Sequence, residues 1–441
     1  MATELLEPAR RLLVVDEAEV LVLGGGPSGI AAAVASARQG ASTLLVERYG
    51  FLGGMGTAAM VTNFCGLFAE VNGEVRRVVR GVADEILERI DALEGLNRPQ
   101  GNGAMTVQAY DTAAYKCAAD QIVLGSGARV RFHTFAVQAL VEGGRIVALI
   151  VESKSGRGAI PAACFVDCSG DADLAAWSGA PFEKGADDGY LAYPTMMFRI
   201  GGVDSKVAGR QGLPRLRQLA NEARARGEYR FLRNSPVTRE QAHPGEWRAN
   251  MTQVSRDGRP VDGTNADDLT YAEVAGREQA VQAARFLREH IPGFANSFIQ
   301  EIAPQIGIRE TRRIVGQYVL TVEDVIGARE FPDVIGCNGW PVEKHVLGGV
   351  DWRPIGGRGY HQIPYRSLLP RDVSNLLVAG RCLSATQDAQ ASARVSGPCF
   401  AMGQAAGAAA ALSVRIGVPP AELGVGKLQA TLRSRGAYLG E

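Results

Sequence analysis

Residues 19–47, EVLVLGGGPSGIAAAVASARQGASTLLVE, decide the fold of this chain. The stretch begins with an apolar run typical of a buried strand and turns at Gly24, Gly26 and Gly29. Small apolar residues at helical spacing follow, and a second apolar run at 42–46 closes the stretch. A strand, a glycine turn, a helix and a second strand form a βαβ unit, which predicts a doubly wound parallel sheet.

The glycine pattern is informative only in this context. Because 54 of the 441 residues are glycine, about one G-x-G-x-x-G match is expected by chance. Between a strand and a helix, Gly24 would make the tight turn, Gly26 would let a diphosphate approach the backbone, and Gly29 would let the helix pack closely. The helix N–H groups would bind the diphosphate, and Glu47 is placed to bind an adenosine ribose. The motif therefore predicts a dinucleotide, either NAD or FAD.

Composition and charge exclude several classes of protein. A hydrophobic content of 46% with 21% charged residues is that of a globular chain, not of a disordered one. The 47 basic residues equal the 47 acidic residues, so no overall positive charge is available to hold nucleic acid or an anionic membrane. The N-terminus lacks the apolar run of a signal peptide, and the seven cysteines are scattered. We therefore expect a cytoplasmic protein with free thiols and no metal site.

The predicted elements divide the chain into three parts. Residues 1–180 carry the βαβ unit and an antiparallel meander over 130–166, whose last strand returns to the first sheet. Residues 181–365 mix helices and strands and are interpreted as an inserted substrate domain, since 441 residues exceed the roughly 250–300 of a single core. Residues 366–441 return a strand and add a helix of small residues. Helices are expected at 76–94, 109–124, 213–227, 266–290 and from Pro398, and further strands at 195–200, 312–320 and 375–379.

Other parts of the chain favour FAD over NAD. A glycine-rich, uncharged loop at 49–57 suits a chain that passes against a flat ring system. A helix that starts after 395–400 could stabilise the anion of a reduced flavin. No second G-x-G-x-x-G follows, so a separate nicotinamide domain is not expected.

Five blocks resemble the FAD-dependent oxidoreductase family, within the two-dinucleotide-binding-domain flavoproteins related to the fumarate reductase flavoprotein and GidA-type proteins. The blocks are GGGPSG at 24–29, FVDCSGDADLA at 165–175, GIRETRRIVGQYVL at 307–320, HQIPYRSLLP at 361–370 and NLLVAGRCLSATQDAQASARVSGPCFAMGQAAG at 375–407. The resemblance runs from about residue 20 to 432. It implies an α/β fold, with a Rossmann-like FAD-binding domain of the glutathione-reductase type, its antiparallel meander, and an inserted mixed α+β substrate domain. No histidine lies in the loop at 53–57, where fumarate reductase relatives attach FAD, so the resemblance implies noncovalent FAD.

Matching positions imply contacts along the whole cofactor. The diphosphate is assigned to Gly26, Pro27 and Ser28, and Gly24 is assigned to the tight turn before them. The ribose and adenine are assigned to Glu47, Arg48 and Ala136, with Gly170 and Asp171 beside the dinucleotide. The flavin ring and ribityl chain are assigned to Gly54, Met55, Thr57, Gly380, Arg381, Ser396, Gly397 and Cys399.

The expected activity is hydride transfer from a small polar organic substrate to flavin N5, as in a dehydrogenase or an oxidase. The electron acceptor stays open among oxygen, a quinone and another flavoprotein, and a homo-oligomer is also left open. Three alternatives remain: a monooxygenase that uses external NAD(P)H, a GidA-like protein that modifies tRNA, and an FAD-binding electron-transfer protein. The neutral net charge argues against the tRNA alternative.

Histidine and arginine supply the catalytic candidates. We prefer His361 as general base and then His345, because both flank a glycine-rich segment that could fold over the flavin. Arg309 and Arg312 could clamp a substrate carboxylate in bidentate fashion. Gln387 stands where many relatives have a histidine, so no acid–base role is inherited there. Only six of the 47 basic residues are lysine, and the scattered arginines favour a coding bias over anion binding.

Overall fold

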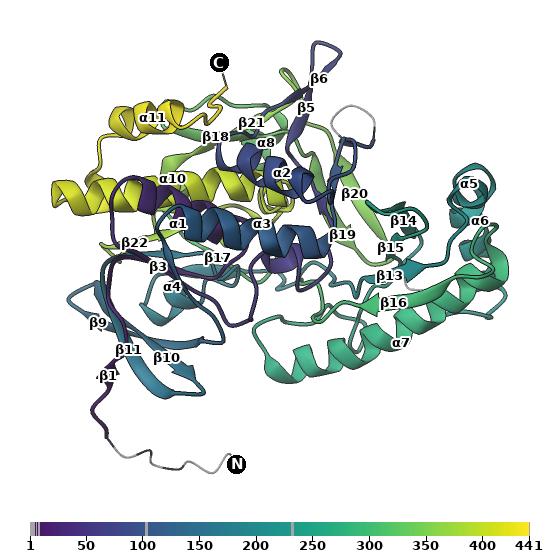
Figure 1. Ribbon diagram of the computed structural model, residues 1–441, viewed down its shortest axis with the longest axis horizontal. Helices are drawn as coiled ribbons and strands as arrows, with labels where there is room; N and C mark the ends of the chain where they lie inside the picture. Colours follow the sequence, from purple (N-terminus) through teal and green to yellow (C-terminus); the bar gives the residue numbers. More distant parts are fainter. Residues whose placement is uncertain (1–4, 6, 8, 102–104, 231–232, 441) are drawn as a thin grey trace.

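The computed structural model describes residues 5, 7, 9–101, 105–230 and 233–440. Its main feature is an eight-stranded mixed sheet covered by helices, so the chain has a mixed α/β fold (Figure 1). The parallel strands of this sheet lie in the order β8 (Arg129–Arg131), β3 (Thr43–Val46), β2 (Ala18–Leu23), β11 (Gly156–Asp167) and β22 (Leu376–Val378). The short β1 (Leu13–Val14) also pairs with β11.

The strand β11 belongs to both halves of the sheet. Its first half pairs antiparallel with β10 (Arg145–Ser153), which pairs with β9 (Phe135–Glu142). Its second half pairs in parallel with β2 and β22. The predicted meander and the predicted returning strand are therefore confirmed as parts of one continuous 12-residue strand.

Helices α1 (Pro27–Arg38) and α10 (Ser396–Ile416) run in parallel, side by side (Figure 1). Glycine allows their close approach: a Cβ at Gly403 would collide with the carbonyl oxygen of Ser28, and one at Gly407 with that of Ala32. Gly403 lies seven residues after the start of α10, whereas its neighbour Ser28 lies one residue after the start of α1. The start of α10 therefore projects roughly 10 Å beyond the start of α1. Two helix N-termini thus point the same way, about two turns apart.

The length and apolarity of α10 would allow it to cross a membrane, but its place in the fold is that of a core helix. Of its most apolar window, 83% is buried inside the protein. No membrane span is implied.

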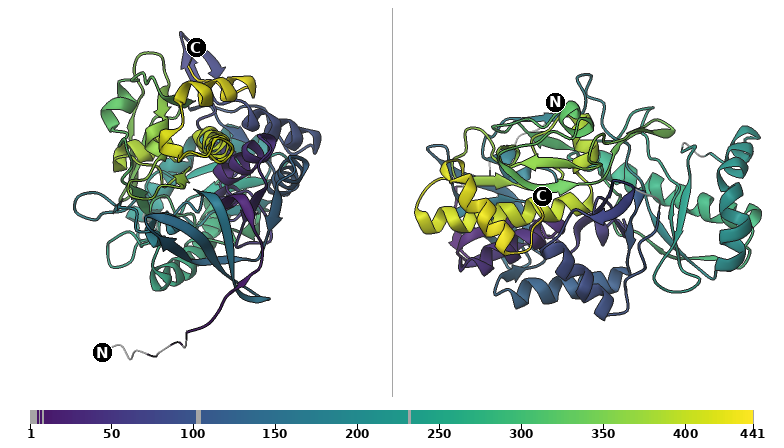
Figure 2. Two further views of the ribbon diagram at one scale, coloured as in Figure 1. Left: turned by 90° about the vertical axis from the view of Figure 1, so that its left-hand side faces the viewer. Right: turned by 90° about the horizontal axis from the view of Figure 1, so that it is seen from above.

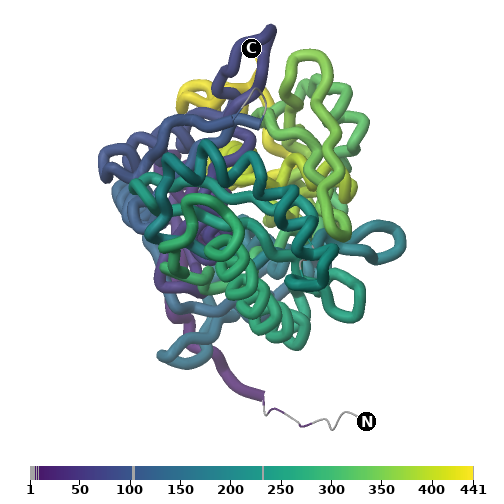
Figure 3. The backbone as a smooth tube through the Cα atoms, turned by 90° about the vertical axis from the view of Figure 1, so that its right-hand side faces the viewer, coloured from purple at the N-terminus to yellow at the C-terminus, as the bar shows by residue number. Residues whose placement is uncertain are grey.

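A second hydrophobic core lies in the lobe at the right of Figure 1, which faces the viewer in Figure 3. The second view of Figure 2 shows this lobe extending away from the main sheet. Its sheet has the order β14 (Val237–Glu240), β15 (Trp247–Asn250), β13 (Phe198–Gly201) and β16 (Phe298–Ile302), with helices α6 (Leu213–Ala225) and α7 (Ala266–His290). The helices predicted at 213–227 and 266–290 are confirmed, whereas most of the buried apolar residues between 320 and 365 belong to the first core. The domain limits at 180 and 365 stay a prediction.

Two predicted elements are wrong in part. The helix expected at 76–94 begins only at Val82 (α2, Val82–Ala92), because Glu74–Arg77 is strand β6, paired with β5 (Phe68–Val71). Both residues of the Asn72-Gly73 turn between these strands have positive φ, 54° and 79°, as a tight hairpin requires. Of the strand expected at 312–320, only Arg312–Ile314 forms one, β17. Helix α3 (Thr112–Gly125) agrees with its prediction at 109–124.

Candidate active site

A cavity of about 370 Å³ runs from the glycine turn after β2 to the sheet of the second lobe. This volume lies in the range of roughly 300–1,000 Å³ that is usual for ligand sites. The structure brings together on its wall most of the residues predicted to bind the cofactor: Gly24, Gly26, Pro27, Ser28, Glu47, Arg48, Gly54, Met55, Ala136, Gly170, Arg381, Ser396 and Cys399.

Four predicted cofactor residues lie behind this wall instead. Thr57 donates its hydroxyl to the carbonyl oxygen of Leu52 (2.8 Å). Asp171 accepts from Arg381 Nη2 (2.8 Å). Gly380 and Gly397 provide close packing, since a Cβ at either would come within 2.7 Å of Ser28 Oγ or of the Cys65 carbonyl oxygen, respectively. Their place in the structure is that of supports for residues that line the cavity.

The start of α1 fits a diphosphate. No side chain caps this helix at Gly26, and a Cβ on Gly26 would meet nothing nearer than Gly54 Cα at 3.7 Å, so the space ahead of the helix is open. Arg381 reaches the same wall; its Nη2 is paired with Asp171, while its buried Nη1 has no partner among the described residues. Helix N–H groups and a guanidinium nitrogen without a partner are the donors that phosphate oxygens require.

Glu47 holds the glycine turn in place. Its carboxylate accepts from the backbone N–H of Gly25 (2.6 Å) and of Tyr49 (2.9 Å). Burial raises the pKa of this carboxyl, and the two backbone N–H groups oppose the rise. Glu47 also lines the cavity, and its carboxylate oxygens have further lone pairs. A hydrogen bond from a ribose hydroxyl to these oxygens stays a prediction.

The far end of the cavity lies at the start of α10. Ser396 begins this helix and accepts from the backbone N–H of Cys65 (3.1 Å). Burial raises the pKa of the Cys65 thiol to about 12. The thiol is therefore protonated near neutral pH and is no nucleophile.

His345 and Glu343 form a buried pair on the wall at this end. Both lie on β19 (Val342–Val346), and His345 Nε2 is 3.1 Å from Glu343 Oε1. Burial lowers the pKa of His345, and the nearby Arg309 lowers it further. Burial alone would raise the pKa of Glu343, but His345 and Arg394 outweigh it and lower that pKa. The pair therefore consists of a neutral imidazole beside a carboxylate.

The structure reverses the preference for His361 over His345. His361, on β21 (His361–Pro364), is fully buried and does not line the cavity. Its Nε2 lies 2.9 Å from Asn338 Nδ2 and 3.1 Å from Ser392 Oγ, so the ring is part of a packed polar cluster. No substrate in the cavity can reach it.

We expect His361 to make the protein sensitive to acid. Burial lowers the pKa of His361 from 6.5 to about 4. Below pH 6.5 the unfolded chain gains a proton that the folded chain refuses, so stability falls as the pH drops from 6.5 to 4, by up to about 3 kcal/mol. Denaturant unfolding at pH 7 and pH 4.5 should show a smaller acid loss for His361→Gln than for the wild type. An equal effect of His243→Gln, whose side chain is 52% exposed, would contradict this assignment.

The clamp predicted from Arg309 and Arg312 is not formed. Arg309 lines the cavity and is 8% exposed. Arg312 lies outside the lining, where it pairs with Asp173 (2.8 Å) and donates to the Asp171 carbonyl oxygen (2.9 Å). The two guanidinium groups therefore cannot grip one carboxylate.

Gln387 belongs to a neighbouring cavity of about 170 Å³. Its amide donates to the Tyr190 carbonyl oxygen (2.7 Å) and to Glu310 (2.8 Å). The two cavities share Glu343, His345 and Arg394 as a common wall. The position at which relatives have a histidine therefore lies on the far side of that wall.

The end of the cavity that Arg309 and Arg394 line also carries three arginines that were not predicted from the sequence: Arg233, Arg239 and Arg248. Their spread along the chain favoured a coding bias. One signal was present in the strand pattern: Arg239 and Arg248 are direct cross-strand partners on β14 and β15. Like charges in such a pair are destabilising without an added partner.

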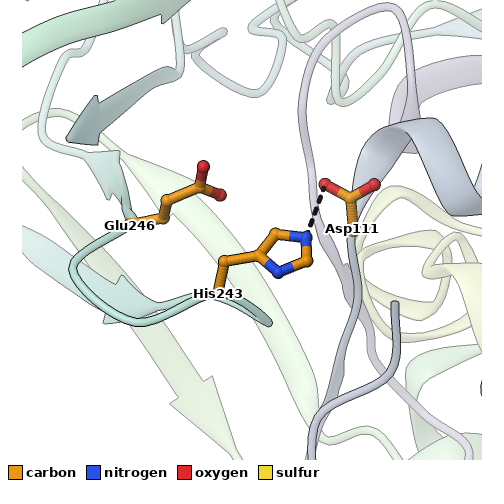
Figure 4. A group of neighbouring side chains, drawn as sticks. All are labelled: Asp111, His243 and Glu246. Atoms are coloured by element: carbon orange, nitrogen blue, oxygen red, sulfur yellow. Dashed lines mark ion pairs between the residues drawn. The ribbon is translucent and has the colours of Figure 1, made fainter. Parts of the chain in front are cut away.

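One group of candidate metal ligands lies outside the cavity: Asp111, His243 and Glu246, whose ligand atoms lie within 4.8 Å of one another (Figure 4). Arg199 already places its Nη1 3.4 Å from Asp111 and 4.0 Å from Glu246. Because this guanidinium supplies the positive charge, we describe the group as an ion-pair network. It joins the start of α3 to the second lobe.

Comparisons with known proteins place the chain in a family. No curated protein matches it. One solved structure that matches is a geranylgeranyl bacteriochlorophyll reductase-like protein from Thermoplasma acidophilum, with 13% identity over 95% of this chain and 84% of that one and a TM-score of 0.45. Another is a p-nitrophenol 4-monooxygenase from Pseudomonas putida, with 10% identity over 97% of this chain and 90% of that one and a TM-score of 0.46. A flavin-dependent brominase with three substitutions also matches, with 12% identity over 95% of this chain and 84% of that one and a TM-score of 0.49. These similarities are too distant to transfer an activity. The family model for FAD dependent oxidoreductases matches residues 19–432, so the chain belongs to that family and its cofactor is FAD.

Proposed function

We propose that the protein oxidises a small polar organic substrate by hydride transfer to FAD, held noncovalently on a Rossmann-like domain of the glutathione-reductase type. The observation that carries this proposal is the His345–Glu343 pair, which lines the cavity at the start of α10. When bound, the flavin supplies a two-electron acceptor at N5. Orientation and proton transfer fall to the chain itself.

His345 is the proposed proton acceptor. If its Nε2–H donates to Glu343, as the 3.1 Å distance allows, then Nδ1 keeps a lone pair for the substrate. As the C–H electron pair of a CH–OH group leaves as hydride, the hydroxyl proton passes to Nδ1 and a C=O group remains. Glu343 then stabilises the imidazolium by charge, so it acts as a positioning residue.

The surrounding walls favour this chemistry. Trp340 and Trp352, whose ring centroids lie 6.0 Å apart, line the same end of the cavity, and the buried ring of Trp340 supplies an apolar wall there. The start of α10 has no side-chain cap and directs the positive end of its dipole toward this end. Negative charge that develops there is stabilised.

An absorbance spectrum followed by anaerobic titration tests the proposal. The purified protein, supplied with FAD, should show flavin bands near ~450 nm, and an alcohol, hydroxy acid or amine should bleach them. Reoxidation by air or by an artificial dye then distinguishes an oxidase from a dehydrogenase. Bleaching by NADPH with no response to any organic substrate would contradict the proposal and favour a monooxygenase. Absent flavin bands would contradict every form of it.

A further inference from the structure

Five arginines converge on one end of the cavity from three separate stretches of the chain. Arg239 and Arg248 come from β14 and β15, Arg233 precedes β14, and Arg309 follows β16. Arg394 ends helix α9 (Gln387–Ala393). We call these five residues the arginine cluster. Three of them are deeply buried: Arg233, Arg248 and Arg309 are 7%, 4% and 8% exposed.

The protein gives the arginine cluster few partners of its own. In the described part of the chain, none of the five forms an ion pair with a carboxylate within 4.0 Å. Arg233 donates Nη1 to Asn250 Oδ1 (3.1 Å) and Nε to the Ser235 carbonyl oxygen (2.8 Å), and Arg309 donates to the Tyr193 carbonyl oxygen. Arg248 Nη1 contacts the weak acceptor Met197 Sδ (3.3 Å), and its Nη2 donates to the side-chain oxygen of Asn63. Arg394 Nη2 lies 3.5 Å from the Glu343 carbonyl oxygen. The buried Nε atoms of Arg248 and Arg394 have no partner among the described residues.

Two arginines outside the cavity do form ion pairs with carboxylates. Arg313, which is 2% exposed, pairs with Glu310. Arg366 pairs with Asp333 through Nε (2.9 Å) and Nη2 (3.2 Å). Among the buried arginines of the described residues, only those that line the cavity lack an ion pair with a carboxylate. There, the carboxylate of Glu343 attracts members of the arginine cluster, but its oxygens are already engaged with His345 and Trp340.

The positive charge of the arginine cluster favours the binding of an anion. Burial, together with the neighbouring Arg239, lowers the pKa of Arg248 to about 10. Burial and other arginines also lower the pKa of Arg309. Guanidinium groups nevertheless stay protonated in proteins near neutral pH. Glu343 attracts Arg233, Arg309 and Arg394. One carboxylate does not balance five positive charges in a buried site, so an additional anion is favoured there.

The cofactor does not supply that anion. Its diphosphate is accounted for by the start of α1 and by Arg381, which is paired with Asp171 in the part of the cavity near Gly170. The arginine cluster lies instead around Cys65, whose backbone N–H bonds Ser396 at the start of α10. Because α10 projects about two turns beyond α1, the two anion-binding ends are separated along the cavity.

We propose that the arginine cluster binds the substrate, and that this substrate is a small organic acid with at least two carboxylates. This inference rests on the proposed function, because the bound acid is a substrate only if the protein oxidises it. The guanidinium groups from both sides of the cavity would hold the carboxylates, and the carbon to be oxidised would lie between them, beside His345. Trp340 and Trp352 would pack against the carbon chain.

Binding of a non-oxidisable dianion tests the inference without any electron transfer. Calorimetric titration of the FAD-loaded protein with malonate should show binding that weakens as salt rises, whereas acetate should bind at least about tenfold more weakly. Arg248→Leu and Arg309→Leu should each weaken malonate binding about 10- to 100-fold, since each removes charged hydrogen bonds. Equal affinity for acetate and malonate, or tighter binding of inorganic phosphate than of malonate, would overturn the proposal.

Stability distinguishes ligand binding from a structural role. Because the arginine cluster carries uncompensated charge, Arg248→Leu should keep or raise the melting temperature of the malonate-free protein. Arg366→Leu, which breaks an internal ion pair, should lower it and leave malonate affinity unchanged. A lowered melting temperature for both Arg248→Leu and Arg309→Leu with unchanged affinity would overturn the proposal. If malonate binds as described but no organic substrate bleaches the flavin, the proposed function fails and the anion site stands.

Discussion

A protein in which valine replaces Gly26 should fold normally and fail to retain FAD. The φ of Gly26 is −72°, which any residue adopts, and the nearest atom to an added Cβ is Gly54 Cα at 3.7 Å. The branched side chain would instead fill the open space ahead of α1, where a diphosphate must approach the backbone N–H groups. Loss of two or more charged hydrogen bonds should weaken FAD binding by at least ~100-fold. Fluorescence titration of the apoprotein with FAD measures this change.

A matched glycine provides the control. Gly426, in helix α11 (Val425–Ser434), has no atom within 4 Å of an added Cβ, so it tolerates a side chain as Gly26 does, but it lies away from the cavity. Gly426→Val should keep both the fold and the affinity for FAD. Full FAD affinity in Gly26→Val would show that the diphosphate does not lie at the start of α1. A large drop in the melting temperature of Gly26→Val apoprotein would mean that Gly26 is needed for folding instead.

The second large effect is expected at His345. His345→Gln should slow reduction of the flavin by the organic substrate about 10²- to 10⁴-fold, the usual contribution of a general base. The amide can still donate to Glu343, so FAD content and malonate affinity should change little. Anaerobic stopped-flow at the flavin band measures the rate. An unchanged rate in His345→Gln, or an equal loss in His243→Gln, would remove His345 from the reaction.

The pH profile gives a separate check on the same residue. Only the unprotonated imidazole accepts a proton, and burial together with Arg309 lowers its pKa. The rate should therefore stay constant from neutral pH to well below 6.5 and fall only as the pH drops through the lowered pKa. A bound dianion would reduce the repulsion from Arg309, so this fall should occur at higher pH for kcat than for kcat/KM. His345→Gln should lose the acid limb; its persistence would assign the limb to another group.

Local rules were sufficient for the cofactor half of the fold. The apolar runs and glycine turn in residues 19–47 predicted β2, α1 and β3, because spacing, turn chemistry and apolar runs agree there. The same rules failed at 76–81, where the apolar and charged residues fit a helical period. The Asn72-Gly73 turn, with φ values of 54° and 79°, outweighed that period and made a hairpin. An Asn-Gly pair is a readable signal, so this error was avoidable.

The catalytic half could not be predicted in the same way. His345 and His361 flank one glycine-rich segment in sequence, yet one lines the cavity and the other is enclosed by Asn338 and Ser392. Which of them reaches the cavity depends on how β19 and β21 pack against the first core. The arginine cluster is assembled from positions 233 to 394, and no local period links residues so far apart. Only their convergence in three dimensions shows that their charges share one space.

The continuous strand β11 has a mechanical consequence. Residues near Asp167 support the glycine turn, and residues near Gly156 support the meander that carries Ala136, so one hydrogen-bonded strand connects the two ends of the predicted adenosine-binding region. Slippage of that strand by one residue would invert every side chain along it and damage both ends together. The adenosine-binding region should therefore open and close as a unit, and amide exchange along β11 should report one opening free energy from Ala159 to Val166.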